Sequence, residues 1–188
     1  CSSDLGIEDL VVGYTVVLAT GETVHLKASP RAAMGPDLRQ LFIGSEGTLG
    51  LVTSVTLKIF PRDLPTLVQT FALPSVEAGL DLMREQALLG LRPYLLRFYD
   101  TDEARHAMQD ASVDSPILFV GTRGPQEVAE AELTVLTRLA TERGGRPLGP
   151  DGVEAWLGRR FDFSTVENLL DEPGGYAETV EVAHTWSG

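Results

Sequence analysis

The chain has 188 residues, of which 43% are hydrophobic and 22% are charged, a composition that excludes a disordered protein. Its net charge of −12, from 15 basic and 27 acidic residues, is opposite to that of a nucleic-acid-binding face, so no nucleic-acid partner is expected. No apolar run reaches the ~20 residues of a membrane-spanning helix, so no transmembrane segment is expected. With a single cysteine and no visible secretory leader, we expect a cytoplasmic protein.

The sequence pattern of the first 60 residues predicts strands and turns. Residues 10–18 are rich in β-branched side chains, residues 19–22 are typical of a turn, and residues 23–27 can form a second strand. This pattern predicts a β-hairpin. Residues 37–42 predict a short helix, and apolar residues spaced along 51–60 predict another strand. The segment between that helix and that strand is Gly44-Ser45-Glu46-Gly47-Thr48-Leu49-Gly50.

Two prolines within residues 61–65 stop both helices and sheet ladders, which predicts a domain border there. Beyond it, the patterns predict strands at 66–73, 94–99, 116–120 and 176–186, and helices at 75–89, 102–109, 126–143, 154–161 and 165–170. Strand–helix–strand occurs twice in this order, which predicts an α+β, ferredoxin-like (split βαβ) domain with its two crossover helices on one face of an antiparallel sheet.

Three glycines within seven residues are the most distinctive feature of the first half. Without side chains, the backbone at Gly44, Gly47 and Gly50 can turn tightly and bring amide N–H groups close to a flat or anionic ligand. Glu46 and Thr48 add a carboxylate and a hydroxyl that can bond a ribose or a ring edge. By itself such a segment is also compatible with an ordinary tight turn between two elements.

The wider string from Gly35 to Thr53 resembles the flavin-binding signature of the FAD-linked oxidases of the vanillyl-alcohol-oxidase superfamily, and the similarity covers residues 7–60. It implies FAD as the cofactor. It also implies that residues 1–62 are the C-terminal part of a PCMH-type FAD-binding domain and that 63–188 are an incomplete C-terminal cap domain. The residues implied to line FAD, largely through backbone groups, are Glu46, Gly47, Thr48, Leu49, Gly50, Leu51 and Val52.

The second half resembles the cap of the alkylglycerone-phosphate (alkyl-dihydroxyacetone-phosphate) synthase branch. That resemblance implies two substrate-binding arginines, Arg97 and Arg160, with Arg159 as the rival of Arg160 in the alignment. A guanidinium binds carboxylate or phosphate through paired, charge-assisted hydrogen bonds, so a small anionic substrate is expected.

Each arginine also has an ordinary structural explanation. Arg97 has Asp100 and Asp102 close by in the sequence, and Arg160 has Asp162, so either arginine can instead belong to a local ion pair. The resemblance names no catalytic residue within the chain. No two histidines have metal-ligand spacing, so no metal site is expected.

Two other functions stay open on the sequence. One is a FAD-dependent 2-hydroxy-acid dehydrogenase for glycolate or D-lactate, and the other is a non-catalytic, ferredoxin-like interaction module. The resemblance implies a partner in the same polypeptide, namely an N-terminal subdomain that binds the FAD pyrophosphate. We therefore expect this chain alone to hold FAD weakly and to be inactive; a homodimer is left open.

Overall fold

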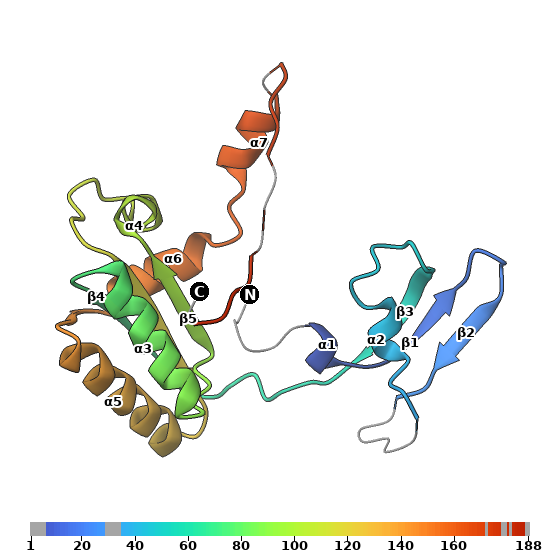
Figure 1. Ribbon diagram of the computed structural model, residues 1–188, viewed down its shortest axis with the longest axis horizontal. Helices are drawn as coiled ribbons and strands as arrows, with labels where there is room; N and C mark the ends of the chain where they lie inside the picture. Colours follow the sequence, from blue (N-terminus) through green and yellow to red (C-terminus); the bar gives the residue numbers. More distant parts are fainter. Residues whose placement is uncertain (1–6, 29–34, 172, 178–179, 181, 187–188) are drawn as a thin grey trace. The chain divides into compact units, whose positions relative to one another are not determined.

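The computed structural model describes residues 7–28, 35–171, 173–177, 180 and 182–186 (Figure 1). The chain divides into two compact units, Cys1–Leu64 and Pro65–Gly188. Part of the strand predicted at 176–186 lies outside the described residues.

The first unit is built on a three-stranded antiparallel sheet with the order β2-β1-β3. Its elements are α1 (Ile7–Leu10), β1 (Val11–Val17), β2 (Thr23–Leu26), α2 (Arg39–Phe42) and β3 (Leu51–Leu57). The predicted hairpin is present, with Tyr14 opposite Leu26 and Val17 opposite Thr23. Its turn closes through hydrogen bonds that include Gly21 N–H to the Leu18 carbonyl at 2.9 Å.

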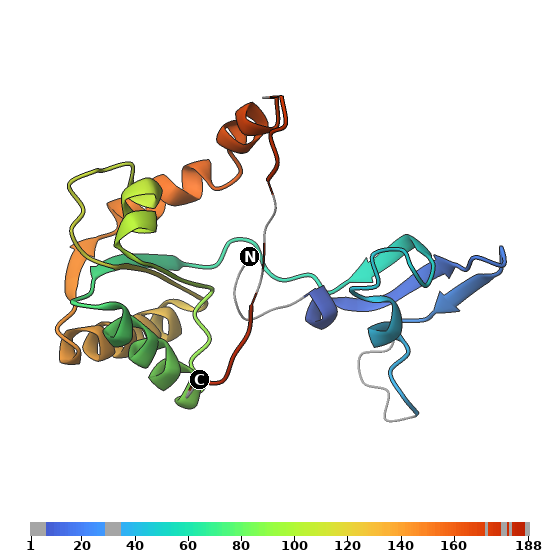
Figure 2. The same cartoon turned by 45° about the horizontal axis from the view of Figure 1, so that its top comes forward.

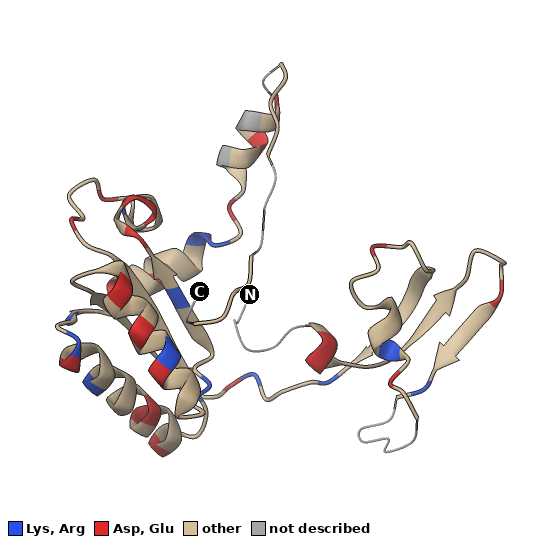
Figure 3. Ribbon diagram, in the orientation of Figure 1, with Lys and Arg blue, Asp and Glu red and all other residues tan. Residues whose placement is uncertain are grey.

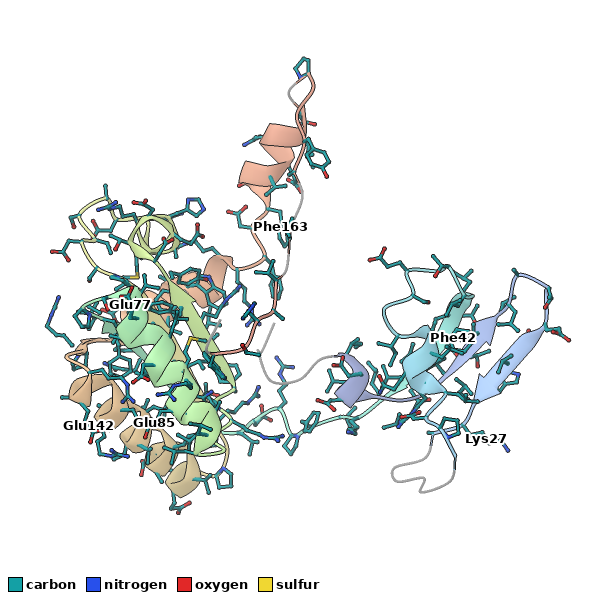
Figure 4. The ribbon with its side chains drawn as sticks, in the orientation of Figure 1. Lys27, Phe42, Glu77, Glu85, Glu142 and Phe163 are labelled. Atoms are coloured by element: carbon teal, nitrogen blue, oxygen red, sulfur yellow. The ribbon has the colours of Figure 1, made fainter. Side chains whose placement is uncertain are left out.

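The core of the first unit is small and lies along β1. Its buried hydrophobic residues are Val11, Tyr14 and Val16, and Phe42 from α2 packs against them with its ring 6.0 Å from that of Tyr14 (Figure 4). By contrast, every residue of β3 is exposed, although β3 pairs with β1 along one edge from Leu51 to Leu57, with a register shift at Thr53. Among the described residues, no strand pairs with the other edge of β3, which is one of the two outer edges of the sheet.

The second unit is a four-stranded antiparallel sheet in the order β5-β6-β4-β7, with helices in its crossovers. Its strands are β4 (Thr66–Ala72), β5 (Leu95–Tyr99), β6 (Ile117–Arg123) and β7 (Arg146–Gly149). Its helices are α3 (Val76–Leu88), α4 (Thr101–Met108), α5 (Gln126–Glu142), α6 (Asp151–Arg159) and α7 (Ser164–Asp171). In chain order this gives β-α-β twice, which confirms the predicted ferredoxin-like arrangement.

Alternation along the strands of the second unit supplies two apolar faces, and each is covered by a pair of helices. The α3 and α5 side contains, among others, Phe71, Leu96 and Leu118. On the other side, Ile117 and Phe119 pack with residues of α4 and α6. Figure 2 shows the green α3 and tan α5 on one side of the sheet and α4 and α6 on the other.

Side-chain and backbone caps set the helix ends of the second unit. The Ser75 hydroxyl accepts the Ala78 N–H at 3.2 Å before α3, and Asp100 accepts the Glu103 N–H at 2.9 Å before α4. Gln109, at φ +51°, ends α4, and Gly144, at φ +77°, follows α5.

The fourth strand of the second unit differs from the prediction. The sequence placed it at 176–186, but it is the four-residue β7, which contains Pro147 and pairs with β4. None of the described residues among 176–186 is in a strand. Because β7 is an edge strand, its proline removes no ladder hydrogen bond from a central position.

Charge is unevenly distributed over the helices of the second unit. Figure 3 shows mainly acidic residues, interspersed with basic ones, along α3 and α5, and basic residues on β5 and at the end of α6. Among the described residues, no helix is both long and apolar enough to cross a membrane.

Candidate functional site

The glycine-rich segment of the first unit connects α2 to β3 by a tight turn. Gly44 and Gly47 have φ of +78° and +82°, and Glu46 between them has φ of +49°. A left-handed conformation is uncommon for a residue with a side chain, so Glu46 is locally strained. The turn is held by Thr48, whose N–H and hydroxyl both donate to the Ser45 carbonyl, at 2.9 and 2.6 Å.

This turn, from Gly44 to Gly50, presents its backbone outward. Of the seven residues predicted to line FAD, six are exposed and Gly50 is intermediate. The N–H groups of Glu46, Gly47 and Leu49 have no acceptor within the described part of the chain. A Cβ at Gly47 would meet no atom within 4 Å. These residues therefore fit a planar cofactor that approaches the backbone closely.

Gly50 has a different role within the turn. Its φ is +157°, and a Cβ there would lie 2.6 Å from Val16 Cγ1, so this position has no room for a side chain. Gly50 thus allows the turn to enter β3 directly against the core strand β1.

Two side chains fasten the segment before the turn to β1. The Tyr14 hydroxyl donates to the Arg39 carbonyl at 2.5 Å, and the Arg39 guanidinium donates to the Val11 carbonyl at 3.1 Å. Asp37 holds the same guanidinium through a 2.6 Å ion pair, which lowers the pKa of the Asp37 carboxyl. Burial raises the pKa of the Tyr14 hydroxyl, so it stays protonated and able to donate. The segment that leads into the turn is therefore held against β1.

The second candidate feature is a pocket of about 230 Å³ in the second unit, between α4 and α6. Its lining residues are mostly polar or aromatic: Tyr99, Glu103, His106, Ala107, Gln109, Trp156, Arg159, Arg160 and Asp162. The predicted residue Arg160 is therefore part of this pocket. No group of three potential metal ligands occurs among the residues that the structure describes.

Arg97 lies on β5 beside this pocket and is bordered by aromatic rings. Its guanidinium carbon is 5.0 Å from the ring centroid of Trp156 and 5.9 Å from that of Tyr99. The local ion pairs considered above are not formed: Asp100 caps α4, and Asp102 pairs with Arg105 at 2.6 Å. Within the described residues, no ion pair includes Arg97.

The two neighbouring arginines at the end of α6 have different contacts. Arg159 donates to the Ala107 carbonyl and so ties α6 to α4. Arg160 is exposed, and its guanidinium carbon is 4.7 Å from the centroid of the Phe161 ring. Asp162 accepts the Ser164 N–H instead of pairing with Arg160, and hydrogen bonds from Ser164 lower its pKa. Arg160 is therefore better placed than Arg159 to reach a ligand.

Sequence reasoning missed several other residues of this pocket, among them Tyr99, Glu103 and His106. Tyr99 lies there half-buried, and burial raises the pKa of its hydroxyl while the charge of Arg97 opposes that rise. Glu103 and His106 come from one face of α4, next to the buried Ala104 and Ala107. Their i, i+3 spacing beside two small buried residues was the available signal. The turn and the pocket belong to different units.

Comparisons with known proteins identify relatives of this chain. Residues 65–188 match the family model described as "FAD linked oxidases, C-terminal domain". The FAD-linked oxidoreductase YgcU of Escherichia coli K12 is 36% identical over 124 residues, which are 64% of this chain and 25% of the relative. An alkyldihydroxyacetonephosphate synthase of Caenorhabditis elegans is 41% identical over 97 residues, covering 52% of this chain and 16% of that protein.

A probable mitochondrial D-lactate dehydrogenase of Danio rerio is 30% identical over 144 residues, which cover 72% of this chain and 29% of that protein. The matched part of the chain thus spans between 16% and 29% of the length of these relatives.

Solved structures share the fold. A structure of alkyldihydroxyacetonephosphate synthase aligns with a TM-score of 0.71 at 23% identity, covering 90% of this chain and 35% of that one. A p-cresol methylhydroxylase structure aligns with a TM-score of 0.56 at 16% identity over 74% of this chain and 34% of that one. The matched family model spans the whole second unit, and the chain therefore belongs to the FAD-linked oxidases.

Proposed function

We propose that this chain supplies one wall of an FAD site and the anion-binding part of the substrate site of a flavoenzyme similar to alkyldihydroxyacetonephosphate synthase. Support comes from the relatives above and from two arginines, Arg97 and Arg160, whose neighbouring carboxylates are engaged elsewhere. The latter is the observation that carries the proposal, because a guanidinium group whose neighbouring carboxylates are engaged elsewhere can bind an anion.

In this proposal the turn from Gly44 to Gly50 holds FAD through backbone N–H groups, those of Glu46, Gly47 and Leu49 among them. When bound, FAD supplies the redox-active ring that substrates of this family meet. Arg97 and Arg160 bind the anionic head group and orient it. A further FAD-binding subdomain of the same polypeptide is the proposed partner, so the purified 188-residue chain is expected to retain little flavin.

A FAD-dependent 2-hydroxy-acid dehydrogenase is the second candidate, favoured by the similarity to the D-lactate dehydrogenase of Danio rerio. Its substrate carries a carboxylate where the first candidate's carries a phosphate. Both candidates need the arginines, so they differ in which anion binds better.

Titration of the 188-residue chain by NMR tests the proposal, with dihydroxyacetone phosphate and D-lactate as the two probes. Arg97→Gln is expected to weaken binding of the preferred probe about 10-fold or more, because a charge-assisted hydrogen bond contributes ~1.5–3 kcal/mol. Arg138→Gln is the matched control: it removes the same charge from α5, where Arg138 pairs with Glu142 of its own helix.

Preferential binding of the phosphate supports the synthase-like function, and preferential binding of D-lactate supports the dehydrogenase. If Arg97→Gln and Arg138→Gln change binding equally, the substrate role of Arg97 is wrong.

A further inference from the structure

Three aromatic side chains from three elements meet beneath Arg97. Tyr99 is two residues from Arg97 on β5 and therefore on the same face of the sheet. Trp156 reaches that face from α6, and Phe119 from the neighbouring strand β6. The guanidinium carbon of Arg97 is nearest to the indole, at 5.0 Å from its centroid.

This aromatic group is itself firmly packed. Phe119 is fully buried, with its ring centroid 5.6 Å from that of Tyr99 and 6.1 Å from that of Trp156. Trp156 is only 9% exposed and belongs to the core cluster on this side of the sheet. The indole is thus a fixed surface, whereas the arginine on it is exposed.

A fixed ring under a guanidinium has a definite effect on ligand binding. The ring face attracts the cation and aligns its plane, while the N–H groups at the guanidinium edge stay available for an oxyanion. An arginine side chain held in this way before the ligand arrives loses less conformational freedom on binding.

The same indole also borders the second arginine. Trp156 lines the 230 Å³ pocket together with Arg160 and Tyr99. Arg97 comes from β5 and Arg160 follows α6. Tyr99 and Trp156 both contact Arg97 and both line the pocket of Arg160, and the ring of Trp156 is the nearer of the two to the Arg97 guanidinium.

We propose that Trp156 is the positioning residue of the anion site: its indole orients the Arg97 guanidinium and forms the wall shared with the pocket of Arg160. This inference rests on the proposed function, in which both arginines bind the anionic head group of the substrate. Trp156 acts through Arg97, and its own contact with the ligand is not required.

The first test needs no substitution. NMR relaxation of the arginine Nε–Hε groups in the 188-residue chain compares Arg97 with Arg146, which also lies exposed on an edge strand. Among the described residues, no aromatic ring or carboxylate is in contact with Arg146. Arg97 is expected to be clearly more restrained than Arg146, and equal mobility of the two would overturn the proposal.

The second test changes the ring. Trp156→Leu is expected to make the Arg97 guanidinium as mobile as that of Arg146 and to weaken binding of inorganic phosphate about two- to fivefold, the range of an exposed cation–π contact. Trp156→Phe keeps an aromatic face and is expected to restore most of both properties. The amide spectrum of β6 reports whether each variant keeps the core around Phe119.

The outcomes separate this inference from the proposed function. If Arg97→Gln weakens phosphate binding but a folded Trp156→Leu variant does not, the positioning role is wrong and the anion site stands. If Arg97→Gln leaves phosphate binding unchanged, the proposed function fails first. If Trp156→Leu does not fold, the positioning role of Trp156 is decided by two other measurements: the mobility of Arg97 relative to Arg146, and the properties of the Trp156→Phe variant.

Discussion

At the scale of single residues, Gly47 and Gly21 form a matched pair. Their φ angles are +82° and +86°, and a Cβ at either would meet nothing within 4 Å. Valine at either position therefore imposes a similar backbone strain, ~1–2 kcal/mol. In the complete flavoprotein, Gly47→Val is expected to lose most of its flavin, because the added side chain occupies the surface proposed to face FAD, whereas Gly21→Val keeps it.

The ratio of flavin to protein absorbance measures this difference in the purified proteins. Thermal unfolding of both variants checks that their loss of stability is similar. Full flavin content in a folded Gly47→Val protein would mean that the turn around Gly47 does not face FAD.

At the scale of elements, the packing of α3 on β5 depends on Gly79. A Cβ at this position would lie 2.3 Å from the Phe98 ring, well inside any contact distance. Gly79→Ala is therefore expected to push α3 from the sheet and to lower the free energy of unfolding by about 1–3 kcal/mol, in spite of the higher helix propensity of alanine.

Gly158 in α6 is the control for this substitution. It has open space around its Cα and an ordinary φ, so Gly158→Ala is expected to raise the free energy of unfolding by ~0.5–1 kcal/mol. Denaturant titrations of the two variants measure both effects. Equal changes in the two variants would mean that α3 does not rely on its close approach to Phe98.

Elements with strong local signals were predictable from the sequence. The cap residue Ser75 predicts where α3 begins, and apolar periodicity predicts α5. The predicted bounds of both helices are close to the observed ones. The edge strand β7 was missed because it has four residues and contains Pro147. The alternation of apolar residues at Val180 and Val182 predicted a strand. Such alternation indicates a strand only where one face of the segment is buried, and both residues are exposed.

Of the candidate site, too, one part could be predicted from the sequence and another could not. The turn around Gly47 was visible because positive φ favours glycine, and sequence shows glycine directly. The pocket was not visible, because Tyr99, His106 and Trp156 come from three elements that only the folded sheet brings together. Sequence alone also left the pairing of Arg97 open, since it does not show that Asp100 is engaged as a helix cap.

At the scale of the whole molecule, the two units have separate cores of different size. Among the described residues, the first unit buries three hydrophobic side chains, Val11, Tyr14 and Val16, whereas the second has two larger clusters. A small core stabilises a fold less. The purified chain is therefore expected to unfold in two steps, the first unit at lower denaturant concentration.

Hydrogen exchange followed by NMR at each denaturant concentration assigns the steps, with β1 amides reporting on one unit and β6 amides on the other. The fragment 65–188 provides the control and is expected to show the later step alone. A single transition with simultaneous exchange of β1 and β6 would contradict this prediction.

The exposure of strand β3 also affects the solubility of the purified chain. Val52 and Val55, which lie opposite Val16 and Tyr14 of β1, share one face and are both exposed, and no described strand pairs with the outer edge of β3. Such an edge invites pairing with an identical edge, which the repulsion between chains of net charge −12 opposes at low salt. Added salt screens that repulsion, so concentrated samples will precipitate as ionic strength rises, and a lysine in place of Val55 will keep them clear.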